Sequence, residues 1–455
     1  MINSKGLAFE LINNGKAYRV RKGAVSAGDV VIPASYNDTS ASKAPAGSLP
    51  VKEVGSGDDV SVEDGAFYET NITGITIPAG VTSIGQHAFL LCASLTSVTI
   101  PASVTSIGDK AIRNGLYNSS ISYVFAGCSE LTSIKVDANN PRFSSEGGIL
   151  YNKEKTLLLA YPGARGNVKI PEGVLVLFEI AFHGSKMNSI TIPASVTEIG
   201  EAAFCYNFSL SAVNFAAGSH LKTIGYNAFN GCKSLTGITI PDGVKSIEFV
   251  AFSDCTSLAD IKIPASVTFI DDSAFDKTAW LKSQPDGLVY AGKFLYKYKG
   301  TMPANTVINN IRADTVAIVG GAFSWCENLT GITIPAGVTF IGDNAFSWCE
   351  NLTGITIPAG VTFIGDNAFY GCTGLRNVTI PSSVTTIGQE AFRDCSNITS
   401  ITIPASVNHV GKWAFHNWTS SQTINVYGKA NQVADAAWDP DWRSDCNALI
   451  NYLGD

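Results

Sequence analysis

The chain has 455 residues, of which only 15% are charged, and its formal net charge is −7. A mildly acidic chain without a run of basic residues is a poor candidate for nucleic-acid binding, because phosphate contacts need clustered Lys and Arg. No stretch of about 18 apolar residues occurs, so the sequence predicts no membrane-spanning helix. The first residues, MINSKGLAFELINNGKAYRV, hold no hydrophobic signal core. Either a signal was removed, or the protein is not exported by that route.

A repeating unit of 23 residues runs through most of the chain. Residues 323–345 read FSWCENLTGITIPAGVTFIGDNA, and residues 346–368 repeat these 23 letters without a change. Prolines mark the same spacing at Pro335, Pro358, Pro381 and Pro404. A fixed period in the twenties with an L-x-x-L-x-L core predicts a solenoid, in which stacked units cover one another's apolar faces.

Within one unit the pattern predicts a short strand followed by a return segment. The apolar side of the strand is formed by Leu352, Ile355 and Ile357. Thr356 faces the other way, because side chains alternate along a strand. Gly365 is expected to allow a sharp corner, because glycine has no Cβ. One short, roughly helical turn then carries the inward-facing Ala368, Phe369 and Cys372.

The pattern LxxIxIPxxVTxIGxxAFxxC, over residues 57–423, resembles the BspA-like leucine-rich repeats of bacterial surface proteins. The resemblance implies a right-handed α/β leucine-rich-repeat solenoid of 23-residue units. A concave parallel β-sheet would form one side, with short helical turns and extended segments on the convex side. Residues 1–56 are similar to the N-terminal extension of such proteins and are expected to form a β-rich cap. Residues 424–455 are similar to their closing segment, and caps protect the strand edges of end units.

Three irregular insertions interrupt the solenoid, at residues 112–124, 136–171 and 276–306. Irregular segments on a regular scaffold often carry specific contacts, although such coils can also merely adjust curvature. The third insertion is basic and aromatic, which suits an acidic glycan or protein, and residues 285–287 predict its hairpin turn. Its candidate partner-binding residues are Tyr290, Lys293, Tyr296, Lys297 and Tyr298. These tyrosines can equally be half-buried strand residues.

Two regular surfaces are further candidates for partner binding. On the strand face the candidate residues are Thr239, Thr333, Thr356, Asn377, Thr379 and Thr402. The alternative is that threonine merely favours exposed strands. Ice binding is a weaker alternative, because this sheet should curve and offers one threonine per unit. On the convex side Trp325 and Trp348 occupy the same slot of adjacent units, either as a contact site or as a by-product of the duplication.

The sequence predicts no disulfide framework, metal site or catalytic centre. Most of the ten cysteines share one slot after a phenylalanine, which predicts a buried ladder of free thiols. No C-x-x-C occurs, and the histidines share no slot. Turn chemistry is a better interpretation than calcium binding for Asp137, Asn139, Asn140 and Glu146. No G-x-S-x-G, Walker loop or H-E-x-x-H occurs, so we expect no catalytic residues and no cofactor.

Together these features predict a noncatalytic binding protein. The resemblance implies adhesion at the bacterial cell surface or after secretion, with a host matrix protein, other cells or a glycan as partner. We expect a monomer without nucleic-acid partners. Two alternatives stay open: a self-assembling structural surface protein, and a cytoplasmic protein-interaction scaffold.

Overall fold

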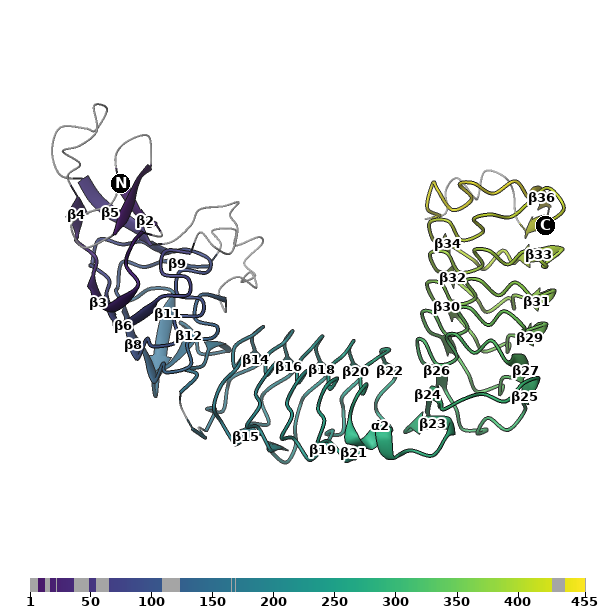
Figure 1. Ribbon diagram of the computed structural model, residues 1–455, viewed down its shortest axis with the longest axis horizontal. Coiled ribbons are helices and arrows are strands. Elements are labelled where there is room, and N and C mark those ends of the chain that lie inside the picture. The colour runs from purple at the N-terminus through teal and green to yellow at the C-terminus, as the bar shows by residue number, and fades with distance from the viewer. Residues whose placement is uncertain are drawn as a thin grey trace. The chain divides into compact units, whose positions relative to one another are not determined.

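The computed structural model describes residues 7–12, 17–21, 23–36, 49–54, 65–108, 123–164, 166–167, 169–427 and 438–454. The chain forms two compact units: unit 1 comprises Met1–Val267 and Phe275–Trp280, and unit 2 comprises Thr268–Ala274 and Leu281–Asp455. Each unit is a stack of rungs built from parallel strands, with little helix (Figure 1). This arrangement confirms the predicted solenoid. The predicted insertion at 112–124 lies outside the described residues, apart from its last two positions.

Unit 1 contains two kinds of parallel sheet. The long-strand sheets run β10-β8-β6-β3 and β15-β17-β19-β21. Their strands are β3 (Ala27–Val31), β6 (Asn71–Thr76), β8 (Ser97–Ile100), β10 (Ser133–Val136), β15 (Ser189–Ile192), β17 (Ala212–Phe215), β19 (Gly237–Thr239) and β21 (Asp260–Lys262). The short-strand sheets contain β7 (Ser83–Ile84), β9 (Ser106–Ile107), β14 (Val176–Leu177), β16 (Glu198–Ile199), β18 (Thr223–Ile224) and β20 (Ser246–Ile247).

Strands of the N-terminal segment and of the second insertion extend the short-strand sheets of unit 1. The first group is β1 (Ala8–Ile12), β2 (Ala17–Arg21) and β5 (Leu49–Val54), with β4 (Ser35–Tyr36) antiparallel to β5. The second is β11 (Phe143–Glu146), β12 (Ile149–Asn152) and β13 (Leu157–Ala160). The second insertion therefore folds as three short strands linked by turns. Its turn is held by Asn140, which is buried and donates to the carbonyls of Pro101 (2.9 Å) and Val104 (2.8 Å).

Unit 2 repeats the two-sheet plan. The short strands of its sheet are β26 (Ala317–Ile318), β28 (Phe340–Ile341), β30 (Phe363–Ile364), β32 (Thr386–Ile387) and β34 (His409–Val410). The two-residue strand β22 (Phe269–Ile270) falls within the residues of unit 2 but not in this sheet. Its long strands are β25 (Thr306–Ile308), β27 (Leu329–Thr333), β29 (Gly354–Thr356), β31 (Asn377–Thr379), β33 (Ser400–Ile403), β35 (Thr423–Tyr427) and β36 (Leu449–Leu453). The short helix α2 (Ala279–Ser283) spans the position in the sequence at which the residues of unit 1 end and those of unit 2 resume.

The third insertion folds as a hairpin, but its turn is not where the sequence predicted it. Strands β23 (Gly287–Ala291) and β24 (Phe294–Lys299) pair antiparallel, so the turn is formed by Gly292 and Lys293. Gly292 has a φ of 62°, which is the left-handed conformation that two-residue hairpin turns require. Residues 285–287 instead lead from α2 into the first strand of the hairpin.

Each regular rung keeps its register with the next. Thr356 of β29 pairs with Thr333 of β27 and with Thr379 of β31. Phe363 of β30 pairs with Phe340 of β28 in the short-strand sheet. The sequence predicted the long strand correctly, since Ile355 is 6% exposed while Thr356 is exposed.

The segment after Gly365 is not the helical turn that the sequence suggested. Ala368 N donates to Gly365 O (3.3 Å) and Cys372 N donates to Phe369 O (3.2 Å), as in consecutive β-turns. Phe369 N, which lies between them, donates to Ala391 O of the next rung (2.9 Å). The N–H groups thus point alternately within the turn and along the stack. A third ladder of hydrogen bonds therefore replaces a helix.

Stacked phenylalanines fill the core behind this turn ladder. In unit 2 the rings of Phe346 and Phe369 lie 5.3 Å apart at an interplanar angle of 3°. The same arrangement continues through Phe392 to Phe415. The edge of Trp442 then covers Phe415 (5.9 Å, 86°), which closes the end of the stack.

The predicted cysteine ladder is confirmed, and the structure adds a reason for it. All ten cysteines are free. Cys372 Sγ donates to Phe346 O of the preceding rung (3.1 Å), and Cys395 Sγ donates to Phe369 O (3.1 Å). In the last rung Trp418 occupies this slot, is 1% exposed, and donates through Nε1 to Phe392 O (2.8 Å). The slot therefore selects a buried side chain that can donate a hydrogen bond.

Because of these buried thiols, the free energy of unfolding should decrease at alkaline pH. Burial raises the pKa of Cys92 from its ordinary value of 9.0 to about 11. Above pH 9 the unfolded chain loses thiol protons that the folded chain keeps. Stability is therefore complete below pH 9 and falls as pH rises, by at most about 1.4 kcal/mol per pH unit for each buried thiol. We expect the Tm to fall between pH 8 and pH 10, as measured by circular dichroism. A Cys349→Ser/Cys372→Ser/Cys395→Ser variant should show a flatter dependence, and an equal fall would contradict the thiol assignment.

Candidate functional site

Most of the predicted strand-face residues reach the surface. Thr239 lies on β19 in unit 1, and the other residues lie on consecutive long strands of unit 2. Thr239, Thr333, Thr356, Asn377 and Thr379 are exposed, and Thr402 is half-buried. The predicted outward direction therefore holds for the five exposed residues, and their role in partner binding stays a prediction.

Not every threonine of the rungs is equally available to a partner. Thr353 Oγ1 donates to Thr330 O of the preceding rung (3.1 Å). Thr385 Oγ1 does the same to Thr362 O (3.1 Å) in the short-strand sheet. By contrast, no residue in the described ranges hydrogen-bonds the hydroxyls of Thr333, Thr356 and Thr379. The column defined by these three residues, here the free threonine column, is thus a row of uncommitted donors and acceptors.

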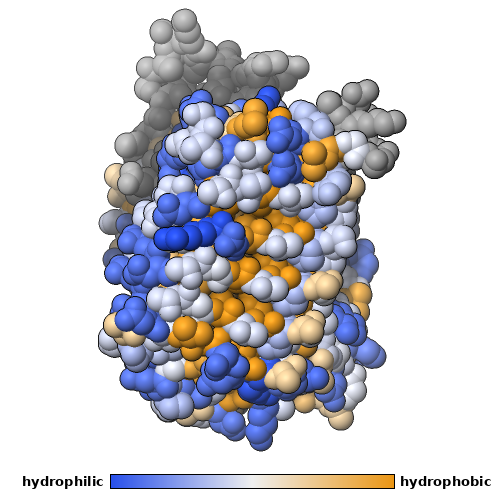
Figure 2. Space-filling view, turned by 90° about the vertical axis from the view of Figure 1, so that its right-hand side faces the viewer, coloured by the Kyte–Doolittle hydropathy of each residue, from blue (hydrophilic) through white to orange (hydrophobic). Residues whose placement is uncertain are grey.

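Figure 2 shows an orange, apolar stripe bordered by white and blue side chains on one face of unit 2. The residues that precede the free threonine column in each strand, Ile332, Ile355 and Val378, are buried at 7%, 6% and 7% exposure. Gly354, on the same strand as Thr356, has no side chain. The strand face therefore offers hydroxyl groups with little side-chain bulk.

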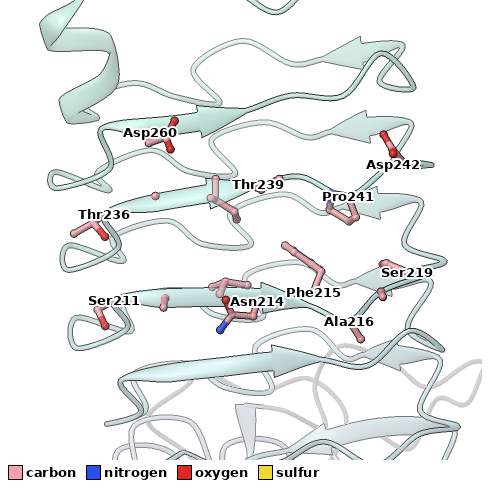
Figure 3. Close-up of a pocket in the computed structure, with 16 residues that line it drawn as sticks. Ser211, Asn214, Phe215, Ala216, Ser219, Thr236, Thr239, Pro241, Asp242 and Asp260 are labelled. Atoms are coloured by element: carbon pink, nitrogen blue, oxygen red, sulfur yellow. The ribbon is translucent and has the colours of Figure 1, made fainter.

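In unit 1 the strand face opens into a groove of about 660 Å³ around Thr239 (Figure 3). Strands β15 and β17 pair over four residues. In this described stretch, β17 meets β19 only at Ala212↔Gly237. The rung from Phe204 to Phe229 has 25 residues instead of 23. These extra residues let the two strands diverge.

The lining of this groove is polar and acidic around one aromatic ring. Phe215 is half-buried, whereas Ile192 at the matching position of β15 is fully buried. Asp242 and Asp260 supply carboxylates, and the lining contains no Lys or Arg. The remaining polar side chains are Ser211, Asn214, Ser219, Thr236 and Thr239. Such a groove suits a neutral or positively charged polar ligand rather than an anion.

The structure does not assemble the predicted residues of the third insertion into one surface. Tyr296 is 2% exposed and belongs to the core. Tyr290 is half-buried, its hydroxyl accepts from Arg312 N (3.0 Å), and the Arg312 guanidinium lies 4.8 Å from its ring centroid. Lys293 is exposed in the hairpin turn, while Lys297 and Tyr298 are half-buried. The interpretation of these tyrosines as strand residues therefore describes the packing better.

The two tryptophans of the repeated slot stack on each other. The rings of Trp325 and Trp348 lie 5.1 Å apart at 13°. Trp325 is 64% exposed, and Trp348 leans over the backbone of Gly371 in the next rung. Tyr370 meets the other side of Trp348 at 4.9 Å and 60°. The sequence predicted that they are adjacent, and the structure shows an aromatic row.

The backbone of this slot is left-handed in many rungs. The φ angle is 62° at Trp325 and 60° at Trp348. Other rungs place at this position Gly127, Gly231, Gly371, Asp254, Asp394 and Asn417, and also the longer side chains of Leu91, Tyr206 and Lys277. Glycine, aspartate and asparagine tolerate positive φ, whereas a bulky side chain costs about 1–2 kcal/mol there. The tryptophans are therefore poorly matched to the local backbone.

The repeat also matches a described family. Residues 60–146, 166–284 and 316–440 match the BspA type leucine rich repeat region, in six copies. The chain belongs to this family. None of the proteins with curated descriptions matches the chain.

Solved structures similar to this BspA-type chain include three bacterial proteins. A leucine-rich repeat protein from Bacteroides ovatus is 22% identical, with 98% of both chains covered and a TM-score of 0.35. A leucine rich cell surface protein from Faecalibacterium prausnitzii is 25% identical, with 96% of this chain and 97% of that chain covered and a TM-score of 0.33. The pneumococcal vaccine antigen PcpA is 14% identical, with 100% of this chain and 98% of that chain covered and a TM-score of 0.28.

Two features of this BspA-type chain were missed by sequence reasoning. One is the groove beside β17, whose signal was the 25-residue interval between two phenylalanines. The other is a pocket of about 550 Å³ on the short-strand sheet of unit 1, where Arg142, Glu154 and Glu198 surround Leu157 and Phe178. Its residues come from an irregular insertion and the rungs after it, and no spacing in the sequence connects them.

Within the described part of the chain, no three His, Cys, Asp or Glu residues cluster closely enough to hold a metal ion. None of its helices has the length and apolar character needed to cross a bilayer.

Proposed function

We propose that this BspA-type protein is a noncatalytic adhesin, at the bacterial cell surface or secreted, that binds host matrix proteins or other cells through its strand face. The free threonine column carries this proposal. Threonines of the neighbouring columns are used between rungs, whereas Thr333, Thr356 and Thr379 leave their hydroxyls to solvent or to a partner. A regular stack holds these groups in place before binding, so little conformational entropy is lost when a partner docks.

The properties of the cysteines and histidines support a noncatalytic role. Burial raises the pKa of Cys205 to about 12, so its thiol is a poor nucleophile at neutral pH. Burial lowers the pKa of His87 and His183, which therefore stay neutral. The rings of His87 and His183 pack edge-on against Tyr123 and Tyr206 respectively, rather than beside a nucleophile.

The strand-face proposal is tested by three substitutions, Thr333→Lys, Thr356→Lys and Thr379→Lys, in one variant. Three long charged side chains would cover the column, so we expect at least a tenfold loss of affinity for whichever partner the unchanged protein binds. The measurement is surface binding to immobilised fibronectin, fibrinogen and a glycan array. The Tm should stay within a few degrees, because these side chains face solvent.

A matched control separates coverage of the face from the change in charge. Thr339→Lys, Thr362→Lys and Thr385→Lys add the same three charges at exposed threonines that directly precede the short strands β28, β30 and β32. The control should keep its affinity. Equal losses in both variants, or full binding by the strand-face variant, would reject the strand face as the binding surface. A mass that rises with concentration in light scattering would favour self-assembly instead.

A further inference from the structure

The aromatic row of unit 2 is capped by a cation at one end and open at the other. Trp325 stacks on Trp348, and Tyr370 follows. The Arg393 guanidinium then lies 5.3 Å from the Tyr370 ring centroid. At the opposite end, Trp325 is 64% exposed, the largest exposed fraction among the large apolar side chains in the described ranges. Its outer face is therefore the free end of this row.

Local structure does not explain the indole at position 325. The slot is left-handed, and Gly371 and Asp394 fill it in later rungs at lower backbone cost. Other rungs fill it with the longer side chains of Leu91, Tyr206 and Lys277. Trp325 is exposed, so it contributes little to the core. A strained residue that the fold does not need is a sign of function. The binding surface must then be the part of the ring that solvent reaches.

This protein repeatedly places a cation over an aromatic ring that reaches the surface. Within the described ranges such pairs are Lys233 with Phe208 (5.1 Å), Arg312 with Tyr290 (4.8 Å), Arg393 with Tyr370 (5.3 Å) and Lys412 with Trp413 (4.3 Å). No described Lys or Arg lies over Trp325. Its electron-rich face is thus left without the cation that the rings of these pairs have.

The turns that carry the two tryptophans also carry negative charges. Glu327 and Glu350 follow Trp325 and Trp348 by two residues and are exposed. Neither carboxylate forms an ion pair with another described residue. The basic residue at the other end of the row, Arg393, already pairs with Glu390 (2.9 Å) and Asp394 (3.5 Å). An exposed indole in turns that also carry two unpaired carboxylates is complementary to a cation.

We propose that Trp325, with Glu327 and Glu350, binds an arginine or lysine side chain from a basic segment of a partner protein. The cation would lie on the outer face of the indole, as Arg393 lies on Tyr370 at the other end of the row. The carboxylates would supply charge complementarity at the rim. This surface consists of turn residues rather than strand residues, so it does not depend on the proposed role of the free threonine column.

The test uses the full chain and a hexa-arginine peptide, with affinity measured by calorimetry and by tryptophan fluorescence at low salt. We expect saturable binding that Trp325→Gly weakens three- to tenfold. Glycine already fills this slot in other rungs, so the variant should fold and its Tm should not fall. The substitution also leaves the net charge at −7, so general attraction of a basic peptide is the same for both proteins. Glu327→Gln with Glu350→Gln should weaken binding about threefold and reduce its salt dependence.

Phe208→Ala provides the matched control. Phe208 is also strongly exposed, at 53%, but Lys233 already covers its ring. This control should bind the peptide as the unchanged protein does. Equal binding by the Trp325→Gly variant, or no binding by the unchanged protein, would overturn the proposal. The proposal would also be overturned if the ligand whose binding Trp325→Gly abolishes proved to be a glycan or a second copy of the chain. A clear fall in the Tm of that variant would overturn it too.

Discussion

Replacement of Phe369 by Ala is expected to lower the free energy of unfolding of unit 2 by about 3–5 kcal/mol. The Phe369 ring is fully buried and stacks between Phe346 and Phe392, at 5.3 Å from each. Its removal leaves a cavity between two rungs whose spacing is fixed by three hydrogen-bond ladders, so the site cannot collapse. The measurement is guanidinium unfolding followed by tryptophan fluorescence. Of the seven tryptophans, all but Trp280 lie in unit 2, so the signal reports mainly this unit.

Phe363→Ala in the same rung is the matched control. Phe363 also stacks on a neighbouring ring, Phe340, at 4.9 Å, but it is only half-buried on the short-strand sheet. We expect a loss of about 1 kcal/mol, because little apolar area returns to water. Similar losses for the two variants would mean that burial in the stack does not determine the stability of the rung.

The second large effect is expected for Gly365→Ala. A Cβ at this position would lie 2.6 Å from Asp343 N and 2.6 Å from the carbonyl carbon of Gly342, and would also collide with the Asp343 carboxylate. Backbone atoms of the preceding rung cannot move aside without breaking its ladders. We therefore expect a loss of about 2–3 kcal/mol, the upper part of the range for overpacked positions. The same unfolding measurement applies.

Gly354→Ala separates crowding from the general effect of adding a methyl group. At Gly354 the nearest atom to an added Cβ is Asn377 O at 3.9 Å, an ordinary contact. Alanine should therefore be tolerated, and it can even stabilise the strand by restricting the unfolded chain. If Gly354→Ala destabilises the protein as much as Gly365→Ala, close approach of the rungs is not the reason why a glycine recurs at the corner of the repeat.

For Gly365 the predicted position is correct, but the predicted reason for the glycine is wrong. The sequence identified this glycine as the corner of the repeat and attributed it to backbone freedom. Its φ is not among the positive values, and the space around its Cα is what excludes a side chain. Conformational freedom can be inferred from one residue type. Contact with the preceding rung cannot, because it depends on how closely two rungs stack.

The sequence by itself determined the period, the long strand and the buried thiol slot. Alternation along a strand places Ile355 inward and Thr356 outward. A slot that recurs every 23 residues has a similar environment in successive rungs, and the cysteine slot is buried in most of them, with Cys326 half-buried. The exposed threonine column and the adjacent tryptophans follow from the same 23-residue period. The family match was therefore expected from the repeat.

Only the tertiary structure decided the short-strand sheet, the turn ladder, the groove around Thr239 and the burial of Tyr296. A two-residue strand is too short to show alternation, and the letters around Phe369 fit a helical turn as well as a β-turn. The choice is made by the next rung, whose Ala391 carbonyl accepts the Phe369 N–H at 2.9 Å. The groove likewise depends on where two strands diverge. A repeat specifies what each rung contains, but hydrogen-bond partners and open spaces belong to pairs of rungs and exist only once the rungs are stacked.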